Sequence, residues 1–222
     1  MFNKKKVFVC ALVVCLIATI SMGTLAWFND SDEVTNNFMI AGSEDDPNEI
    51  FSVDVWEKTP AEEKDQDGHD YGDIQPGDLL LKEAHVENTG YYDQYIRVTV
   101  TISDAQAWIA ALGADFNAAD VFVGFEPTMW NHIWNNLSEN PAAEEIQYVM
   151  YYNGILGAGE DITVFENVQI PGSLDQYQMA EFGGNFSITV KADAVQTANV
   201  VPEGTAPEDA AWAAFKFVES NS

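Results

Sequence analysis

Apolar and polar residues alternate with a period of two in three segments of this chain. In residues 96–103, Ile or Val occupies every second position and Arg, Thr or Ser fills the positions between. Residues 51–55 and 186–194 follow the same pattern. Such alternation is typical of strands that bury one face and expose the other to water. It therefore predicts antiparallel sheets with one apolar face each.

Weaker strand patterns occur between these segments. They cover residues 79–87, 121–125, 146–152 and 162–170, the last with a bulge expected near Phe165. Residues with turn chemistry separate them, at 75–78, 88–90, 153–154 and 171–172. Many short strands joined by turns predict an all-β fold, a jelly-roll-like antiparallel β-sandwich with short helical inserts. The pattern alone leaves jelly-roll and immunoglobulin-like topologies open.

Helical spacing occurs in three places. The first predicted helix is capped by Ser103 and ends before Gly113. Thr128 is expected to cap a second helix, whose apolar face would carry Met129, Ile133, Trp134 and Leu137. A third helix is predicted over residues 206–218. The sandwich is thus expected over residues 46–200 with a helical insert at about 103–140, followed by a C-terminal helix and tail at 201–222.

The N-terminus has the organisation of a secretory signal peptide. Lys4, Lys5 and Lys6 precede an apolar run over residues 7–20, and Thr24 and Ala26 supply small residues at the positions that a signal peptidase requires. We expect residues 1–26 to be removed by cleavage between Ala26 and Trp27. An uncleaved membrane anchor is the alternative, but the apolar run is short for a span of ~20 residues.

Cleavage changes both the cysteine content and the charge. Cys10 and Cys15 lie in the signal segment, so the mature chain has no disulfide and no thiol chemistry. The whole chain has 9 basic and 36 acidic residues, and the signal removes three lysines and no acid, which leaves a formal charge of −30. So negative a chain repels phosphate backbones, which excludes a nucleic-acid partner.

Catalytic motifs are absent from the sequence. Its three histidines, His69, His85 and His132, form no His-Glu-x-x-His zinc motif, and we expect His85 and His132 to be solvated surface residues. No nucleophile elbow, phosphate-binding loop or dinucleotide fingerprint is present. Paired carboxylates are expected by chance among 36 acids, so they do not indicate a glycosidase.

One acidic segment resembles a calcium-binding loop. Glu63, Asp65, Asp67 and Asp70 place carboxylates near Gly68, and hard oxygen ligands around a glycine turn are what calcium prefers. The closing glutamate and the flanking helices are missing, so a solvated acidic loop is the favoured interpretation and no cofactor is required. Core packing is likewise favoured over a carbohydrate platform for five aromatic residues: Trp108, Trp130, Trp134, Tyr151 and Tyr152.

Several segments resemble a known family of secreted proteins. Residues 23–30, Gly-Thr-Leu-Ala-Trp-Phe-Asn-Asp, resemble the junction cut by SipW-type signal peptidases. Residues 34–42 resemble the first mature strand of the TasA/camelysin family, and residues 186–196 are similar to its closing strand. Residues 74–78 and 86–90 also match, in the family's order.

The resemblance implies a secreted jelly-roll protein of Gram-positive bacteria that forms biofilm-matrix fibres or coats the cell or spore surface. Family members polymerise by donor-strand exchange, in which an N-terminal strand completes the sheet of the next subunit. The implied donor segment is 27–45, and its apolar residues would be costly to leave in water: Trp27, Phe28, Val34, Phe38 and Ile40. Pairing of this segment within its own sheet is the alternative.

The expected partners are further copies of the chain, a SipW-type signal peptidase during export, and an anchoring or accessory matrix protein. No membrane association is expected after cleavage. Two other functions stay open. One is a camelysin-like secreted metalloendopeptidase, and the other is a calcium-dependent surface adhesion module that uses Asp65, Asp67 and Asp70.

Overall fold

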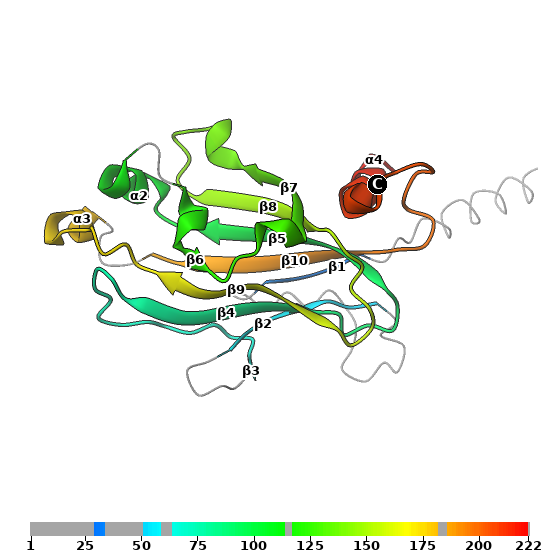
Figure 1. Cartoon of the computed structure of the whole chain (residues 1–222), viewed down its shortest axis with the longest axis horizontal. Coiled ribbons are helices and arrows are strands. Elements are labelled where there is room, and N and C mark those ends of the chain that lie inside the picture. Colours follow the sequence, from blue (N-terminus) through cyan, green and yellow to red (C-terminus); the bar gives the residue numbers. More distant parts are fainter. Residues whose placement is uncertain (1–28, 34–50, 59–63, 114–116, 182–185, 222) are drawn as a thin grey trace, which may run out of the picture.

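A computed structural model describes residues 29–33, 51–58, 64–113, 117–181 and 186–221. The chain forms two five-stranded antiparallel sheets that lie in layers (Figure 1). Sheet A contains, in spatial order, β1 (Asn29–Glu33), β10 (Ile188–Gln196), β5 (Gln94–Ile102), β8 (Ile146–Tyr152) and β7 (Trp130–Asn135). Sheet B contains β3 (Lys64–Asp65), β2 (Asp54–Lys58), β4 (Leu79–Glu87), β9 (Asp161–Gln169) and β6 (Phe122–Val123). This architecture confirms the predicted all-β sandwich.

The alternating segments form the inner faces of both sheets. In β5, Ile96, Val98, Val100 and Ile102 are all buried, and the residues between them are partly exposed or polar. The predicted ranges 79–87 and 146–152 coincide with β4 and β8. Alternation succeeds here because each strand has one face against the opposite sheet.

The predicted bulge near Phe165 is confirmed. Ala84 pairs with Phe165 and His85 pairs with Thr163, so Val164 is an extra residue on β9. Val164 and Phe165 are both fully buried, which strict alternation would forbid. The Phe165 ring stacks on Phe122 at 4.6 Å, and this contact joins β6 to the core.

Two of the three predicted helices are present. Helix α2 (Ala105–Leu112) ends at Gly113, whose positive φ of 96° suits glycine, and α4 (Ala210–Asn221) follows the 3-10 turn η4 (Pro207–Asp209). Ser103 is not the cap of α2, because Asp104 occupies that position; the Ser103 hydroxyl instead accepts a hydrogen bond from the amide of Ser187. The remaining short elements are α3 (Gln176–Glu181), η1 (Ala118–Val121), η2 (Pro127–Met129) and η3 (Asn136–Ser138).

The predicted helix beginning at Thr128 is wrong. Residues 130–135 form β7, which pairs with β8 through Trp130–Tyr152 and Trp134–Val149. His132 has a φ of 48° at the bulge in this pairing, and Ile133 is exposed instead of facing the core. Aromatic and β-branched residues favour strands when a neighbouring strand offers a ladder, and that pairing overrides the helical spacing.

A second apolar cluster lies outside the sandwich, where α4 covers sheet A (Figure 1). Phe215 and Val218 of α4 pack with Tyr95, Tyr151 and Val195. Four of the five aromatic residues considered for a carbohydrate platform are partly or fully buried, and Trp134 is the most exposed, at 37%. Within the described ranges, no helix has the length and apolar character needed to cross a bilayer.

Candidate functional site

The edges of the two sheets differ in how they are protected. In the part of sheet B that the structure describes, the edge strands β3 and β6 are two residues long each. In sheet A, β7 carries the His132 bulge at one edge, and β1 lies at the other. Short and bulged edges resist pairing with other chains. Behind β1, however, lies β10, a regular nine-residue strand.

Strand β1 pairs only with β10 among the described strands. Its register places Asn29 opposite Val195 and Glu33 opposite Lys191. Its sequence, Asn-Asp-Ser-Asp-Glu, contains no apolar residue. The described contact of these five residues is the antiparallel ladder with β10, whose main-chain hydrogen bonds are worth about 0.5–1.5 kcal/mol net each.

The N-terminal predictions fall partly outside the described residues. Ala26 and Trp27 of the cleavage site lie there, as do the other apolar residues assigned to the donor strand: Phe28, Val34, Phe38 and Ile40. The described part of segment 27–45 is β1, and it pairs with β10 of its own chain. The single chain thus has the within-sheet arrangement that was the alternative to exchange.

Arg97 of β5 joins β10, the strand that pairs with β1, to α4. Its Nε and Nη2 donate to Asp193 of β10 at 3.0 and 2.7 Å, and its Nη1 donates to Glu219 of α4 at 2.6 Å. The guanidinium also lies over the Phe215 ring, 4.6 Å from its centroid. Burial opposes the charge on Arg97, but the hydrogen bond and attraction from Asp193 outweigh it and raise the pKa of the guanidinium. Arg97 is therefore a permanent cation that ties α4 to β10.

We expect acid to weaken this attachment of α4. Burial would raise the pKa of Glu219, but hydrogen bonds from Lys216 and Arg97 outweigh it and lower that pKa from its ordinary value of 4.5. The ionised carboxylate therefore stabilises the fold above pH 4.5, and this stabilisation is lost as the pH falls through the lower folded-state pKa. Urea unfolding from pH 6 to 3 should show a smaller pH dependence for Glu219→Gln than for the wild type. An identical dependence would contradict this role.

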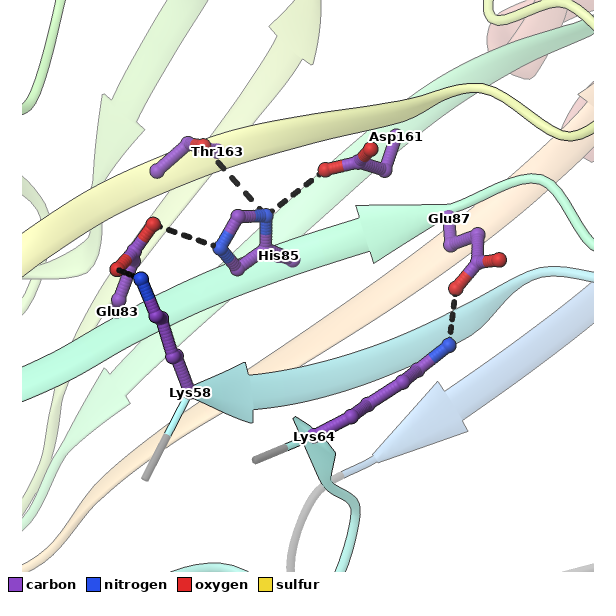
Figure 2. A network of polar contacts seen from close by, with 7 residues as sticks. All are labelled: Lys58, Lys64, Glu83, His85, Glu87, Asp161 and Thr163. Atoms are coloured by element: carbon purple, nitrogen blue, oxygen red, sulfur yellow. Dashed lines mark hydrogen bonds and ion pairs between the residues drawn. The ribbon is translucent and has the colours of Figure 1, made fainter. Parts of the chain in front are cut away.

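His85 lies at the centre of a polar network on the outer face of sheet B (Figure 2). Its Nδ1 is 2.9 Å from Asp161 and its Nε2 is 3.1 Å from Glu83. The ring stacks on Trp56 at 3.9 Å with an interplanar angle of 2°. His85 is only 7% exposed, so the prediction of a solvated surface histidine is wrong. The alternating pattern correctly places His85 on the outer face of β4, but the Trp56 ring covers it there.

The same network contains two lysines. Lys58 lies 3.6 Å from Glu83, and Lys64 pairs with Glu87 (Figure 2). Lys64 also lies over the Trp56 ring. The contacts join β2, β3, β4 and β9. None of these residues lines either of the two cavities described below. The network therefore links neighbouring strands of sheet B to one another.

A buried ion pair was missed in the sequence. Glu57 of β2 and Lys82 of β4 pair with each other and are 2% and 8% exposed. Glu57 occupies the position after Val55 on the inward face of its strand, and Lys82 falls between Leu80 and Ala84. A charged residue at an inward position of an alternating strand was the available signal.

The acidic segment does not gather into a metal site within the described residues. Glu63 lies outside them, and Asp65 accepts a hydrogen bond from the amide of Asp67 at 2.9 Å. Asp67 and Asp70 line a cavity of about 310 Å³ that Lys82 also borders. In the part of the chain that is described, no three His, Cys, Asp or Glu side chains are placed to share a metal ion.

The other two histidines lie apart from His85. His69 contacts Tyr71 edge-on at 4.8 Å in the acidic loop. His132 bonds to Asp209 at 2.9 Å and stacks on Trp212, so it holds the start of α4 against β7. The sequence had placed His132 on the outer side of a helix, and that is wrong because the segment is a strand.

A larger cavity opens at the end of the sandwich where α2 and α3 lie. Its volume is about 560 Å³. Its wall contains these large apolar side chains: Ile74, Trp108, Ile170, Leu174, Met179 and Phe186. Gly72, Asp73 and Gln176 border it and are exposed. We call it the end cavity.

Comparison of the chain with protein-family models, with curated proteins and with solved structures finds no match.

Proposed function

We propose that this chain is a secreted structural protein of the extracellular matrix or cell surface, which assembles into fibres when β1 of one copy pairs with β10 of another. The observation that carries the proposal is the edge of sheet A. In the described residues, a regular nine-residue strand is covered there by the five residues of β1, none of which is apolar. The other three edges in the described chain are short or bulged. Strand addition to an open edge is a recurrent mode of assembly.

Exchange of β1 replaces one set of pairs by an identical set, so the driving force must come from elsewhere. Full burial of a large apolar side chain stabilises by roughly 1.5–3 kcal/mol. The segment around β1 contains five such residues by sequence: Trp27, Phe28, Val34, Phe38 and Ile40. In a fibre they would be available for burial between copies, and this burial would offset the entropy lost on association.

Export and localisation follow from the same proposal. A SipW-type peptidase would cut between Ala26 and Trp27 and release the chain from a Gram-positive cell. An accessory matrix protein would anchor the fibres. No observation in the described residues favours the peptidase or the calcium-adhesion alternative, so we do not propose either.

Charge gives the proposal a direct test. A mature chain of formal charge −30 repels its own copies, and salt screens that repulsion over about 10 Å at 0.1 M. Protein beginning at Trp27 should therefore form fibres in electron micrographs more readily at 0.5 M than at 0.01 M salt. Monomers at every salt and protein concentration would overturn the proposal.

A further inference from the structure

Helix α4 belongs to an apolar cluster that is separate from the core of the sandwich. Among the described residues, the larger cluster between the two sheets contains no residue of α4. The buried side chains of the helix, including Phe215 and Val218, pack on the outer face of sheet A, on the side away from sheet B (Figure 1). Clusters that share no buried residue can lose their packing separately. The docking of α4 is therefore distinct from the folding of the sandwich.

Side-chain contacts hold α4 at both ends. At its start, His132 Nε2 lies 2.9 Å from Asp209 of η4, and the His132 ring stacks on Trp212 at 4.6 Å. Near its end, Glu219 accepts a hydrogen bond of 2.6 Å from Arg97. The side chains of Asp209 and Glu219 are each 43% exposed, so water competes for both carboxylates and each contact contributes little. We call His132–Asp209 and Arg97–Glu219 the end contacts of α4.

The connection between β10 and α4 contains a turn about which the helix can move. Residues 202–204 are exposed, and Gly204 has a positive φ of 86°. The amide and the hydroxyl of Thr205 both donate to the carbonyl of Pro202, so these bonds stay intact when α4 moves. A helix of twelve residues is marginal in water when it is isolated. We therefore expect α4 to undock and melt as one unit.

Docked α4 lies over the part of β10 that pairs with β1. Val195, which is opposite Asn29 of β1, is 1% exposed in the cluster that contains α4. Asp193, which is opposite Ser31, accepts hydrogen bonds from Arg97, the residue that also binds α4. The same residues of β10 therefore support α4 on the outer face of the sheet and β1 at its edge.

We propose that α4 is a latch that opens while the sandwich stays folded, and that the closed latch holds β10 in the position that binds β1. Opening uncovers Val195 and takes the Glu219 carboxylate away from Arg97. Residues 193–195 then lose their support on the outer face, and pairing with β1 weakens. The inference concerns the single chain and is independent of fibre formation.

Cysteine labelling tests the opening, because the chain from Trp27 onward has no cysteine. Ala214 in α4 and Ala84 between the sheets are both fully buried, so Ala214→Cys and Ala84→Cys are matched probes. In low salt, the Ala214→Cys thiol should react at least tenfold faster than the Ala84→Cys thiol. Its rate should also depend less steeply on urea, because opening of α4 exposes less surface than global unfolding. Equal rates with equal urea dependence would overturn the latch.

Hydrogen exchange followed by mass spectrometry tests the hold on β1. Asp209→Ala/Glu219→Ala removes both end contacts, and Glu203→Ala/Glu208→Ala removes the same charge from exposed positions as the matched control. Relative to the control, the first variant should exchange the amides of α4 and of β1 several times faster, while the amides of β4 keep their protection.

The other outcomes of the exchange experiment would contradict the proposal. Faster exchange in α4 with unchanged protection of β1 would overturn the hold on β10, and unchanged exchange in α4 would overturn the role of the end contacts. The unsubstituted chain gives a check that no substitution can disturb. In it, α4 should exchange faster than β5, and loss of protection from both in a single step would overturn the latch.

Discussion

Removal of residues 27–42 is expected to abolish fibre formation and to leave folded monomers. The deletion removes β1 but no described residue of the core between the sheets. Sheet A keeps four strands, and α4 still covers its outer face. The truncated protein should therefore retain its far-ultraviolet circular dichroism while sedimenting as a monomer, and electron micrographs should show no fibres.

A synthetic peptide of residues 27–42 provides the control for this deletion. Added to the truncated protein, it should bind stoichiometrically to the vacated β10 edge without restoring fibres, because it has no second body to connect. Added in excess to the intact protein, it should shorten fibres by capping. Fibres of unchanged yield from the truncated protein would contradict strand exchange.

Glu57→Gln is expected to destabilise the sandwich by about 3–5 kcal/mol, because it leaves the charge of buried Lys82 without its partner. The side chain of Lys82 is 10% exposed, so the pair is largely desolvated. The substitution preserves volume, which separates the electrostatic cost from a packing cost. Urea unfolding followed by intrinsic fluorescence measures the free energy of unfolding.

Lys64→Gln is the matched control for the buried pair. Lys64 and Glu87 form an ion pair whose side chains are 44% and 27% exposed, so its loss should cost at most about 1 kcal/mol. The double variant Glu57→Leu/Lys82→Met should be close to wild type, since apolar replacement of a whole buried pair is often neutral. Equal losses for Glu57→Gln and Lys64→Gln would contradict the importance of burial.

The sequence predicted the strands whose two faces meet different environments. Residues 96–102 alternate because one face packs in the core. The bulge at Phe165 was visible in the sequence as a break in the alternation of residues 162–170. Residues 128–137 were mistaken for a helix because apolar residues three and four apart also occur by chance. Only the ladder with β8, which the local sequence does not encode, makes this segment a strand.

The polar sites were less predictable, because they depend on long-range contacts. Alternation placed His85 on the polar face of β4 but gave no sign that Trp56 covers it. Strand β1 has no periodic pattern, so its pairing with β10 could not be predicted from the local sequence. The Glu57–Lys82 pair, in contrast, could have been inferred from two charges at inward positions.

Intermolecular pairing of β1 with β10 can be measured directly with two single-cysteine chains. Glu33 and Lys191 lie opposite each other in the register, so cysteines at these positions can form a disulfide. When Glu33→Cys and Lys191→Cys chains are mixed, assembled and oxidised, strand exchange predicts covalent heterodimers in the fibre fraction. Fibres without heterodimers, together with closure of the disulfide inside each copy of the doubly substituted chain, would contradict strand exchange.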